Sequence, residues 1–382
     1  MKILTSVCLL FIVGFCTSSS QAQDIHYSMF DMAPLELNPA YTGYYSGTFR
    51  VGGIYRTQWA GMSVSNPTST TNEPRSFGGY QTPSAYIDVP FAIPRKGKPI
   101  RNWAGVGISF YYDAVGTDGG ATLSNLAASL SLAYHLGLGA KGNTVLSIAA
   151  QGGIMQRRIS GEFTFEDQLL GGGGISTTDP LYASALGASG TKTLPDFSGG
   201  LMLSHRARRF GFEAGVSLNH FTNPNYSFMT PNENEDDEAK LPMTTIANLA
   251  MRIALTKKGN LFLKPLFFFQ NSINTTGEGD GISAFDFNGQ LLLGIHFNDM
   301  QDITLYVGGG YRASGDAIAR IGLDVKGLKF GFAYDINTGT QGLNSQVFQN
   351  NNRAMAFEVA LSYVAKIYKV PVIEDVLFCP RF

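Results

Sequence analysis

The chain has 382 residues and a formal net charge of −1, with 15% charged residues, 12% aromatic residues and 45 glycines. The share of charged residues is well below the roughly 25% of soluble domains, which argues against a typical soluble protein. Beyond the N-terminus no apolar run approaches the ~18 residues of a spanning helix, which argues against a helical membrane protein. The near-neutral charge also excludes the basic surface of a nucleic-acid-binding protein, so no nucleic acid partner is expected.

The N-terminus has the pattern of an export signal. Lys2 supplies the positive charge, residues 3–15 form an apolar core, and Ser20, Gln21 and Ala22 make a small-x-small cleavage site. We therefore expect residues 1–22 to be a cleaved signal peptide.

The cysteines indicate how the mature chain is held together. Cys16 could instead be a lipidation site, but Phe15 is too bulky for the residue that precedes a lipidated cysteine. With Cys8 and Cys16 removed, only Cys379 remains, so no intramolecular disulfide is expected.

Fourteen segments alternate apolar with small or polar side chains, the pattern of strands that separate two environments. They predict an all-β fold: a transmembrane antiparallel up-and-down β-barrel of outer-membrane type with about 14 strands, spanning residues 48–366. The second segment has the weakest pattern, because Pro83 and Pro90 interrupt it. The predicted strands are residues 48–60, 77–89, 103–113, 121–138, 143–157, 195–206, 209–222, 243–256, 259–272, 283–298, 301–313, 315–326, 328–338 and 353–366.

The alternation predicts which side chains face lipid. In residues 103–113, Ile108 and Phe110 share one face, and Gly107 and Ser109 share the other. Aromatic residues gather near both predicted strand ends, as in the girdles of membrane barrels; a secreted soluble barrel or sandwich would fit the alternation but would not need the girdles. The outer girdle is Phe110, Tyr112, Phe267, Phe269, Phe285 and Phe287, and the inner girdle is Tyr134, Phe210, Phe212, Phe297 and Tyr363.

The connections alternate between short and long from the fourth strand onward. Short turns are expected at residues 139–142, 206–208, 257–259, 298–301 and 326–327, whereas residues 159–194 and 222–242 form long loops. Outer-membrane barrels have short periplasmic turns and longer extracellular loops, and an even strand count places both termini in the periplasm.

A fourteen-strand barrel encloses more space than wall side chains fill, so part of its lumen should be occupied. The candidates are the loop with the glycine run at residues 171–174 and the N-terminal segment, residues 23–47, which is expected in the periplasm or lumen. The glycine pairs 52–53, 78–79, 199–200 and 308/310 are interpreted as strand bends or close-packing points.

Catalytic and metal-binding chemistry has little support. The five histidines lie on different segments, and Asn219 and His220 point to opposite faces of a strand, so they cannot share a site. The acidic run at residues 233–238 lacks the spacing and turn glycine of a calcium loop, and we interpret it as a solvated loop tip that could attract a basic partner. We expect no enzymatic activity, no cofactor and no metal.

Motifs at the two ends of the chain are more specific. LNPAYTG at residues 37–43 precedes the first strand, YRTQWAG at residues 55–61 lies on it, and FEVALSY at residues 357–363 lies on the last strand. With QD at residues 23–24, YSMF at residues 27–30 and CPRF at residues 379–382, these motifs resemble the PorP/SprF family of outer-membrane barrels of the type IX secretion system. The residues that carry the resemblance are Asn38, Pro39, Ala40, Tyr41, Gly43, Tyr55, Arg56, Gln58, Trp59, Glu358, Cys379, Pro380, Arg381 and Phe382.

The residues themselves support a structural role for these motifs. Asn38 and Pro39 favour a turn, and Gly43 permits a sharp entry into the barrel. Arg56 and Glu358 should both point into the lumen on strands that pair when the barrel closes, so we predict an ion pair between them across the seam, the alternative being two separately hydrated charges.

The resemblance implies a non-enzymatic secretion component. Its expected partners are outer-membrane lipid, the periplasmic ring and peptidoglycan-linked subunits, and the C-terminal sorting domains of secreted cargo such as gliding adhesins. Residues 38–43 and the tail at residues 367–382 would then lie at the periplasmic rim, ready for docking, and the extended 370–373 stretch could pair with a partner strand. The alternative is a general or hydrophobic-substrate outer-membrane channel.

Overall fold

The computed structural model describes residues 26–59, 62–64, 75–92, 101–117, 122–139, 142–160, 190–226, 228, 240–273, 283–298, 302–338 and 355–367. The expected signal peptide, the acidic run, the 171–174 glycine run and the 368–382 tail lie outside these residues. No helix in the described part of the chain is long and apolar enough to cross a membrane.

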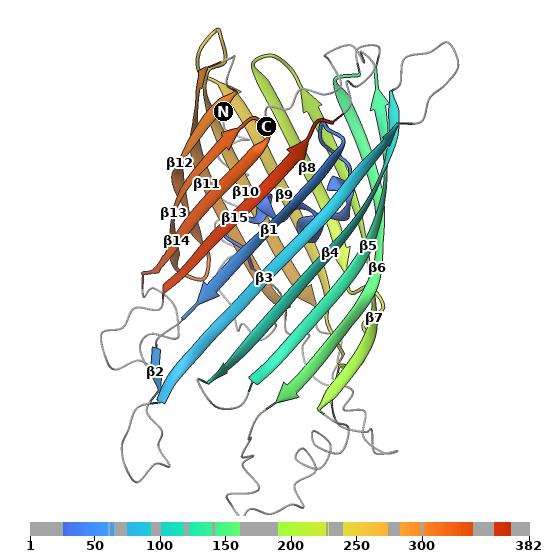
Figure 1. Cartoon of the computed structure of the whole chain (residues 1–382), viewed down its shortest axis with the longest axis vertical. Coiled ribbons are helices and arrows are strands. Elements are labelled where there is room, and N and C mark those ends of the chain that lie inside the picture. The colour runs from blue at the N-terminus through green and yellow to red at the C-terminus, as the bar shows by residue number, and fades with distance from the viewer. Residues whose placement is uncertain are drawn as a thin grey trace, which may run out of the picture.

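The chain forms a closed antiparallel barrel of fourteen strands (Figure 1), as predicted. Strand β1 pairs with β3 on one side and with β15 on the other, which closes the ring, while the short β2 extends β3. The strands are β1 Phe49–Gln58, β2 Met62–Val64, β3 Arg75–Ala92, β4 Asn102–Thr117, β5 Thr122–Leu138, β6 Thr144–Ser160, β7 Thr191–Arg206, β8 Phe210–Asn219, β9 Met243–Ala254, β10 Leu261–Ile273, β11 Ser283–Asn298, β12 Ile303–Arg312, β13 Asp316–Val325, β14 Leu328–Asn337 and β15 Met355–Ala365.

The predicted second strand is confirmed in β3, an 18-residue strand that contains both prolines despite the weak pattern of its sequence. Proline removes one ladder donor, so it is tolerated where pairing is incomplete. Pro90 lies beyond the β1 partners of β3, and the β3–β4 register passes from Gln81 to Ser84 without pairing Pro83. A register shift between Phe77 and Tyr80, with Gly79 at φ +70°, confirms the bend expected at the second glycine pair.

The two wall faces separate as predicted. Outward side chains such as Phe110, Leu132, Ile148 and Leu291 are 49–57% exposed, and they form an apolar surface suited to lipid. Many inward side chains are polar and buried; examples are Ser109, Ser131, His135, Ser217, Asn288 and Gln290.

The two rims of the barrel differ in their connections. One, here called the short-turn rim, carries the predicted turns, and both the start of β1 and the end of β15 lie there (Figure 1). The other, the long-loop rim, carries connections 161–190, 220–242 and 338–354. The alternation is incomplete, because connections 118–121 and 313–315 at the long-loop rim are short and connection 93–101 at the short-turn rim is not.

Residues 26–47, here called the luminal segment, lie inside the barrel (Figure 1). They form two 3₁₀ turns, η1 Phe30–Met32 and η2 Pro39–Tyr41, and one helical turn, α2 Pro34–Leu37. Their buried side chains build two apolar clusters with inward wall residues, one around Phe30, Leu37 and Trp103 and the other around Met29 and Ile54. The N-terminal candidate for lumen occupancy is therefore confirmed.

Candidate functional site: a plugged lumen

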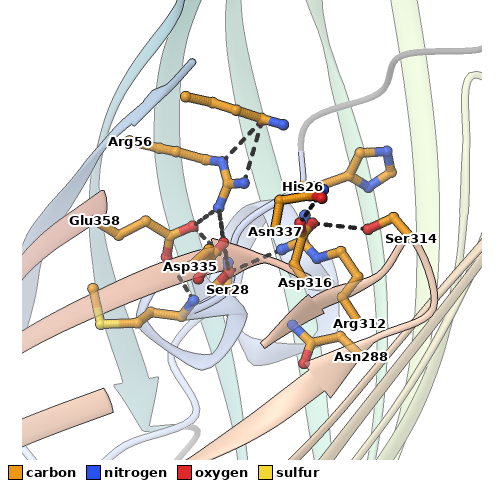
Figure 2. Close-up of polar contacts among 12 residues, drawn as sticks. His26, Ser28, Arg56, Asn288, Arg312, Ser314, Asp316, Asp335, Asn337 and Glu358 are labelled. Atoms are coloured by element: carbon orange, nitrogen blue, oxygen red, sulfur yellow. Dashed lines mark hydrogen bonds and ion pairs between the residues drawn. The ribbon is translucent and has the colours of Figure 1, made fainter. Parts of the chain in front are cut away.

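The first fixed point of the luminal segment is Ser28, which is fully buried among charged wall side chains (Figure 2). Glu358 of β15 accepts hydrogen bonds from the backbone N–H groups of Ser28 and Met29, at 2.6 and 2.7 Å. Asp335 of β14 accepts one from the Ser28 hydroxyl at 2.6 Å, and Arg312 of β12 donates one to that hydroxyl at 2.9 Å. Every polar group of Ser28 is satisfied, since Gln290 Nε2 donates to its carbonyl at 2.5 Å.

The predicted ion pair between Arg56 and Glu358 is confirmed and forms part of this socket. The two residues are direct partners in the β1–β15 register, and Arg56 Nη1 donates to the Glu358 carboxylate. The same nitrogen lies 3.0 Å from Asp335 Oδ2. Because the three side chains are at most 4% exposed, the pair is not the hydrated alternative but a buried charge network that also binds the luminal segment.

A second ionic contact joins the luminal segment to β10 and β13, on the same side of the wall as the first. Asp31 Oδ1 lies 2.7 Å from Arg320 Nη1, and its Oδ2 accepts a hydrogen bond from Lys264 Nζ at 2.9 Å. Burial alone would raise the pKa of Asp31, but Arg320 and Lys264 outweigh it and hold the pKa well below its ordinary value. One carboxylate is thus shared by two wall cations.

A third contact lies toward the short-turn rim. Arg50 of β1 binds Asp88 of β3 in a bidentate pair, with distances of 2.9 and 2.8 Å, and Asp88 also accepts the Gly43 N–H at 2.6 Å. Trp103 Nε1 donates to the Gly43 carbonyl at 3.0 Å, and the Trp103 ring stacks on His135 at 4.7 Å. Gly43 has φ +72°, which explains why a glycine stands where the segment turns into the barrel wall.

Asn38 and Pro39 make a local turn, as predicted, but not at the rim. Asn38 Oδ1 accepts the Ala40 N–H at 2.9 Å, and its Nδ2 donates to the Leu201 carbonyl at 3.1 Å. Asn38, Pro39, Ala40 and Tyr41 are buried, so these four residues lie within the lumen and the rim placement expected for them is wrong. Gly43, at the end of the motif, lies toward the short-turn rim beside Asp88 and Trp103. The inward glycines on the wall are the feature of the sequence that could have indicated a position inside the lumen.

Those glycines provide the space that the luminal segment fills. A methyl group added at Gly105 would lie 2.1 Å from the Thr42 carbonyl oxygen, and one at Gly200 would lie 2.0 Å from Asn38 Oδ1. Added methyl groups at Gly107 and Gly331 would lie 2.8 Å from side-chain atoms of the segment. Gly200 is therefore a close-packing point, as interpreted from the sequence.

Glu36 is a buried carboxyl of the segment whose charge is not offset by a cation from its hydrogen-bond neighbours Ser84 and Tyr27. Burial raises its pKa from 4.5 to about 8, and hydrogen bonds from Ser84 and Tyr27 only partly oppose this effect. Its hydrogen-bond partner Ser84 lies on β3, so the protonation state of Glu36 is coupled to docking of the segment against that strand.

The remaining motif residues divide between the two faces. Gln58 Oε1 accepts from Arg56 Nη2 at 3.2 Å, inside the barrel. Tyr55 is 38% exposed and packs on Phe357, whereas Trp59 packs edge-on to Tyr80 at 5.4 Å. Cys379, Pro380, Arg381 and Phe382 lie outside the described residues. The docking roles expected of these residues stay predictions.

Between the luminal segment and the barrel wall lies a cavity of about 190 Å³, here called the vestibule, which is lined by residues of β1, β3 and β7–β15. Phe30, Asp31 and Leu292 line its inner end, and turn residues such as Gly259, Asp302 and Gly327 line it at the short-turn rim. The vestibule therefore extends from that rim to the luminal segment.

Residues 19–363 match the family model described as type IX secretion system membrane protein PorP/SprF. No curated protein matches the chain.

The chain is also similar in fold to solved outer-membrane barrels of low sequence identity. A TodX deltaS2S3 mutant, a monoaromatic hydrocarbon channel, is 11% identical with a TM-score of 0.50, covering 91% of this chain and 95% of that one. The toluene transporter TbuX of Ralstonia pickettii is 12% identical with a TM-score of 0.46, covering 92% and 96%. A FadL homologue from Pseudomonas aeruginosa is 12% identical with a TM-score of 0.44, covering 86% and 92%. The family model spans most of the chain, and the chain belongs to the PorP/SprF family of type IX secretion system membrane proteins.

Proposed function

We propose that this chain is a non-enzymatic outer-membrane component of the type IX secretion system that supports secretion or surface attachment of cargo proteins with C-terminal sorting domains. The observation that carries the proposal is the family match across residues 19–363. Gliding adhesin-like proteins are the class of cargo that we expect.

The two rims have different roles in this proposal. Short turns face the periplasm in outer-membrane barrels, so the short-turn rim is the side that docks to the periplasmic ring and peptidoglycan-linked subunits. The longer connections face outward and contact cargo. A lumen occupied by residues 26–47 supports a docking role over that of an open porin, which keeps a water-filled channel.

The function is tested by deleting the gene and following secretion of a reporter fused to a C-terminal sorting domain. We expect the reporter to be retained in the deletion strain and released again on complementation. Affinity purification of the full chain, cross-linked in the outer membrane, should recover periplasmic ring subunits or a sorting domain. Normal secretion in the deletion strain would contradict the proposal, and steady currents from the purified protein in a planar bilayer would then favour the channel alternative.

The orientation has a separate test, in a Cys379→Ser background. We expect a membrane-impermeant maleimide to label Ser314→Cys, in the 313–315 turn, on intact cells and to label Lys258→Cys, in the 255–260 turn, only after lysis. The reverse pattern would invert the assignment of the rims.

A further inference from the structure

The vestibule contains a cluster of aromatic and basic side chains centred on Tyr306 of β12. Phe262 of β10 packs edge-on to the Tyr306 ring at 5.9 Å, Lys264 Nζ lies 5.6 Å from the Tyr306 centroid, and the Arg252 guanidinium lies 4.3 Å from the Phe262 centroid. Gly294 makes this packing possible, because a methyl group there would lie 2.2 Å from the Phe262 ring. The cluster therefore presents cations that are held on aromatic faces.

Positive charge exceeds negative charge in this cluster. Around Tyr306, the carboxylates of Asp31 and Asp324 face four cations, which are Arg252, Lys264, Arg320 and Lys329. The whole lining has two further carboxylates, Glu213 and Asp302, and three further cations, Arg50, Arg206 and Lys366, so the excess of positive charge holds for the vestibule as a whole. Asp31 is shared by Arg320 and Lys264, and Asp324 lies 3.9 Å from Lys329. A recessed cavity with an excess of one charge concentrates the field and attracts the opposite charge.

The shape of the vestibule suits an extended chain. Leu292 at its inner end lies six residues before the end of β11, which corresponds to a depth of roughly 15 Å for a strand tilted by about 45°. An extended peptide covers that depth with about five residues. The luminal segment closes the inner end, so an inserted chain would stop at Asp31, Lys264 and Arg320 instead of passing through.

We propose that the vestibule is a binding site for an extended peptide segment that carries carboxylates and aromatic side chains and is presented by a periplasmic partner. Carboxylates would pair with the cations around Tyr306, and aromatic rings would pack on Phe262 and Tyr306. The periplasmic location of the partner rests on the proposed function. The binding chemistry rests only on the cavity.

The test measures fluorescence anisotropy of labelled ten-residue peptides against the full chain in nanodiscs of zwitterionic lipid. We expect a peptide of alternating Glu and Phe to bind, with an affinity that falls as salt rises. A Lys–Phe peptide and a Glu–Ala peptide should bind at least about tenfold more weakly, because each lacks one half of the recognition.

Variants locate the site. Arg252→Gln and Lys329→Gln should each weaken binding of the Glu–Phe peptide by about tenfold, since each removes a cation that lines the vestibule while the pairs of Asp31 with Lys264 and Arg320 stay in place. Lys258→Gln is the matched control, because Lys258 is an exposed cation at the same rim that does not line the vestibule. The unfolding midpoint of each variant, measured in parallel, verifies the fold.

Four outcomes would overturn the proposal. The first is equal binding of the Lys–Phe peptide, and the second is unchanged peptide affinity in both vestibule variants. The third is loss of binding when phosphatidylglycerol replaces the zwitterionic lipid, and the fourth is a tenfold or larger gain in peptide affinity when the chain is truncated after Ile367. The third would assign the site to lipid headgroups, and the fourth to the chain's own last residues. Failure of peptide binding leaves the secretion assay unaffected, so the two proposals can fail separately.

Discussion

At the scale of single residues, the luminal segment is held by charges that compensate one another inside the barrel. Glu358 is fully buried and receives Arg56 and two backbone N–H groups, so its charge is balanced without water. Burial of an ion costs several kcal/mol, and the cost is recovered only when hydrogen bonds satisfy the whole group. Glu358 meets this condition, because both of its carboxylate oxygens accept hydrogen bonds, and it should therefore be sensitive to substitution.

Glu358→Gln should therefore destabilise the protein by about 3–5 kcal/mol. The amide N–H₂ of the glutamine would face groups that already donate hydrogen bonds, and Asp335 would be the remaining carboxylate partner of Arg56. The measurement is the denaturant midpoint of the detergent-solubilised barrel. Asp316→Asn is the control, since Asp316 at the long-loop rim bonds only Ser314 and Asn337 among the hydrogen bonds of the described residues. Equal effects of the two variants would contradict the buried network.

Glu36 gives the stability a pH dependence of defined sign. Its folded-state pKa is raised from 4.5 to about 8, so the folded state favours the protonated carboxyl and its contribution is lost as pH rises from about 4.5 to 8. We expect Glu36→Gln to remove this part of the slope when unfolding midpoints are compared between pH 5 and 9. Parallel curves for the variant and the parent would show that Glu36 does not titrate in that window.

At the scale of elements, the luminal segment has little regular structure of its own and depends on the wall for its shape. It has one helical turn and two 3₁₀ turns, none of which would be stable alone in water. Its contacts are side-chain hydrogen bonds to the wall and close approaches at inward glycines. Docking of the luminal segment should thus be sensitive to substitutions at inward wall positions, even where the strands themselves tolerate the substitution.

Gly105→Ala should displace the segment while the barrel remains folded, because the new methyl group would lie 2.1 Å from a backbone oxygen of Thr42. Trp103, which donates to Gly43, reports the change: in a Trp59→Phe background its emission should shift to longer wavelength as the indole is exposed. Gly199→Ala is the control, since its methyl group would meet only the Ala149 carbonyl at 3.6 Å. Identical spectra of both variants would contradict close packing at Gly105.

The barrel could be predicted from the sequence because each strand repeats the same two-residue alternation, and the register of Arg56 with Glu358 follows from closure. The path of the luminal segment could not, since residues 26–47 lack a period and their contacts join positions about 300 apart, such as Ser28 with Asp335. The partners of Asp31 were equally hidden. Arg320 and Lys264 lie on separate strands, and no pattern in the sequence links them to Asp31.

At the scale of the whole molecule, the barrel combines an apolar exterior with an inner wall that carries both buried charges and apolar side chains behind the luminal segment. Arg56, Glu358 and Asp335 remain paired on the wall if the segment is absent, as do Arg50 and Asp88. Among the ion pairs of the described residues, Lys264 and Arg320 would lose their shared partner Asp31, and Asp286 would lose His26. These side chains could then be hydrated. These charged wall positions are accordingly compatible with water, and the luminal segment lies in the path between the two rims.

Deletion of residues 26–45 should therefore convert a poorly conducting barrel into an open one. We expect its conductance in a planar bilayer to exceed that of the intact chain by about tenfold or more, because a fourteen-strand barrel is wider than the eight-strand barrels that side chains fill. Gly105→Ala should give intermediate or flickering currents if the displaced segment still enters the lumen, whereas Gly199→Ala should match the parent. Heat-dependent migration on a detergent gel separates a folded barrel from an unfolded one. A folded deletion variant that conducts no more than the intact chain would mean that the lumen is closed by residues other than the luminal segment.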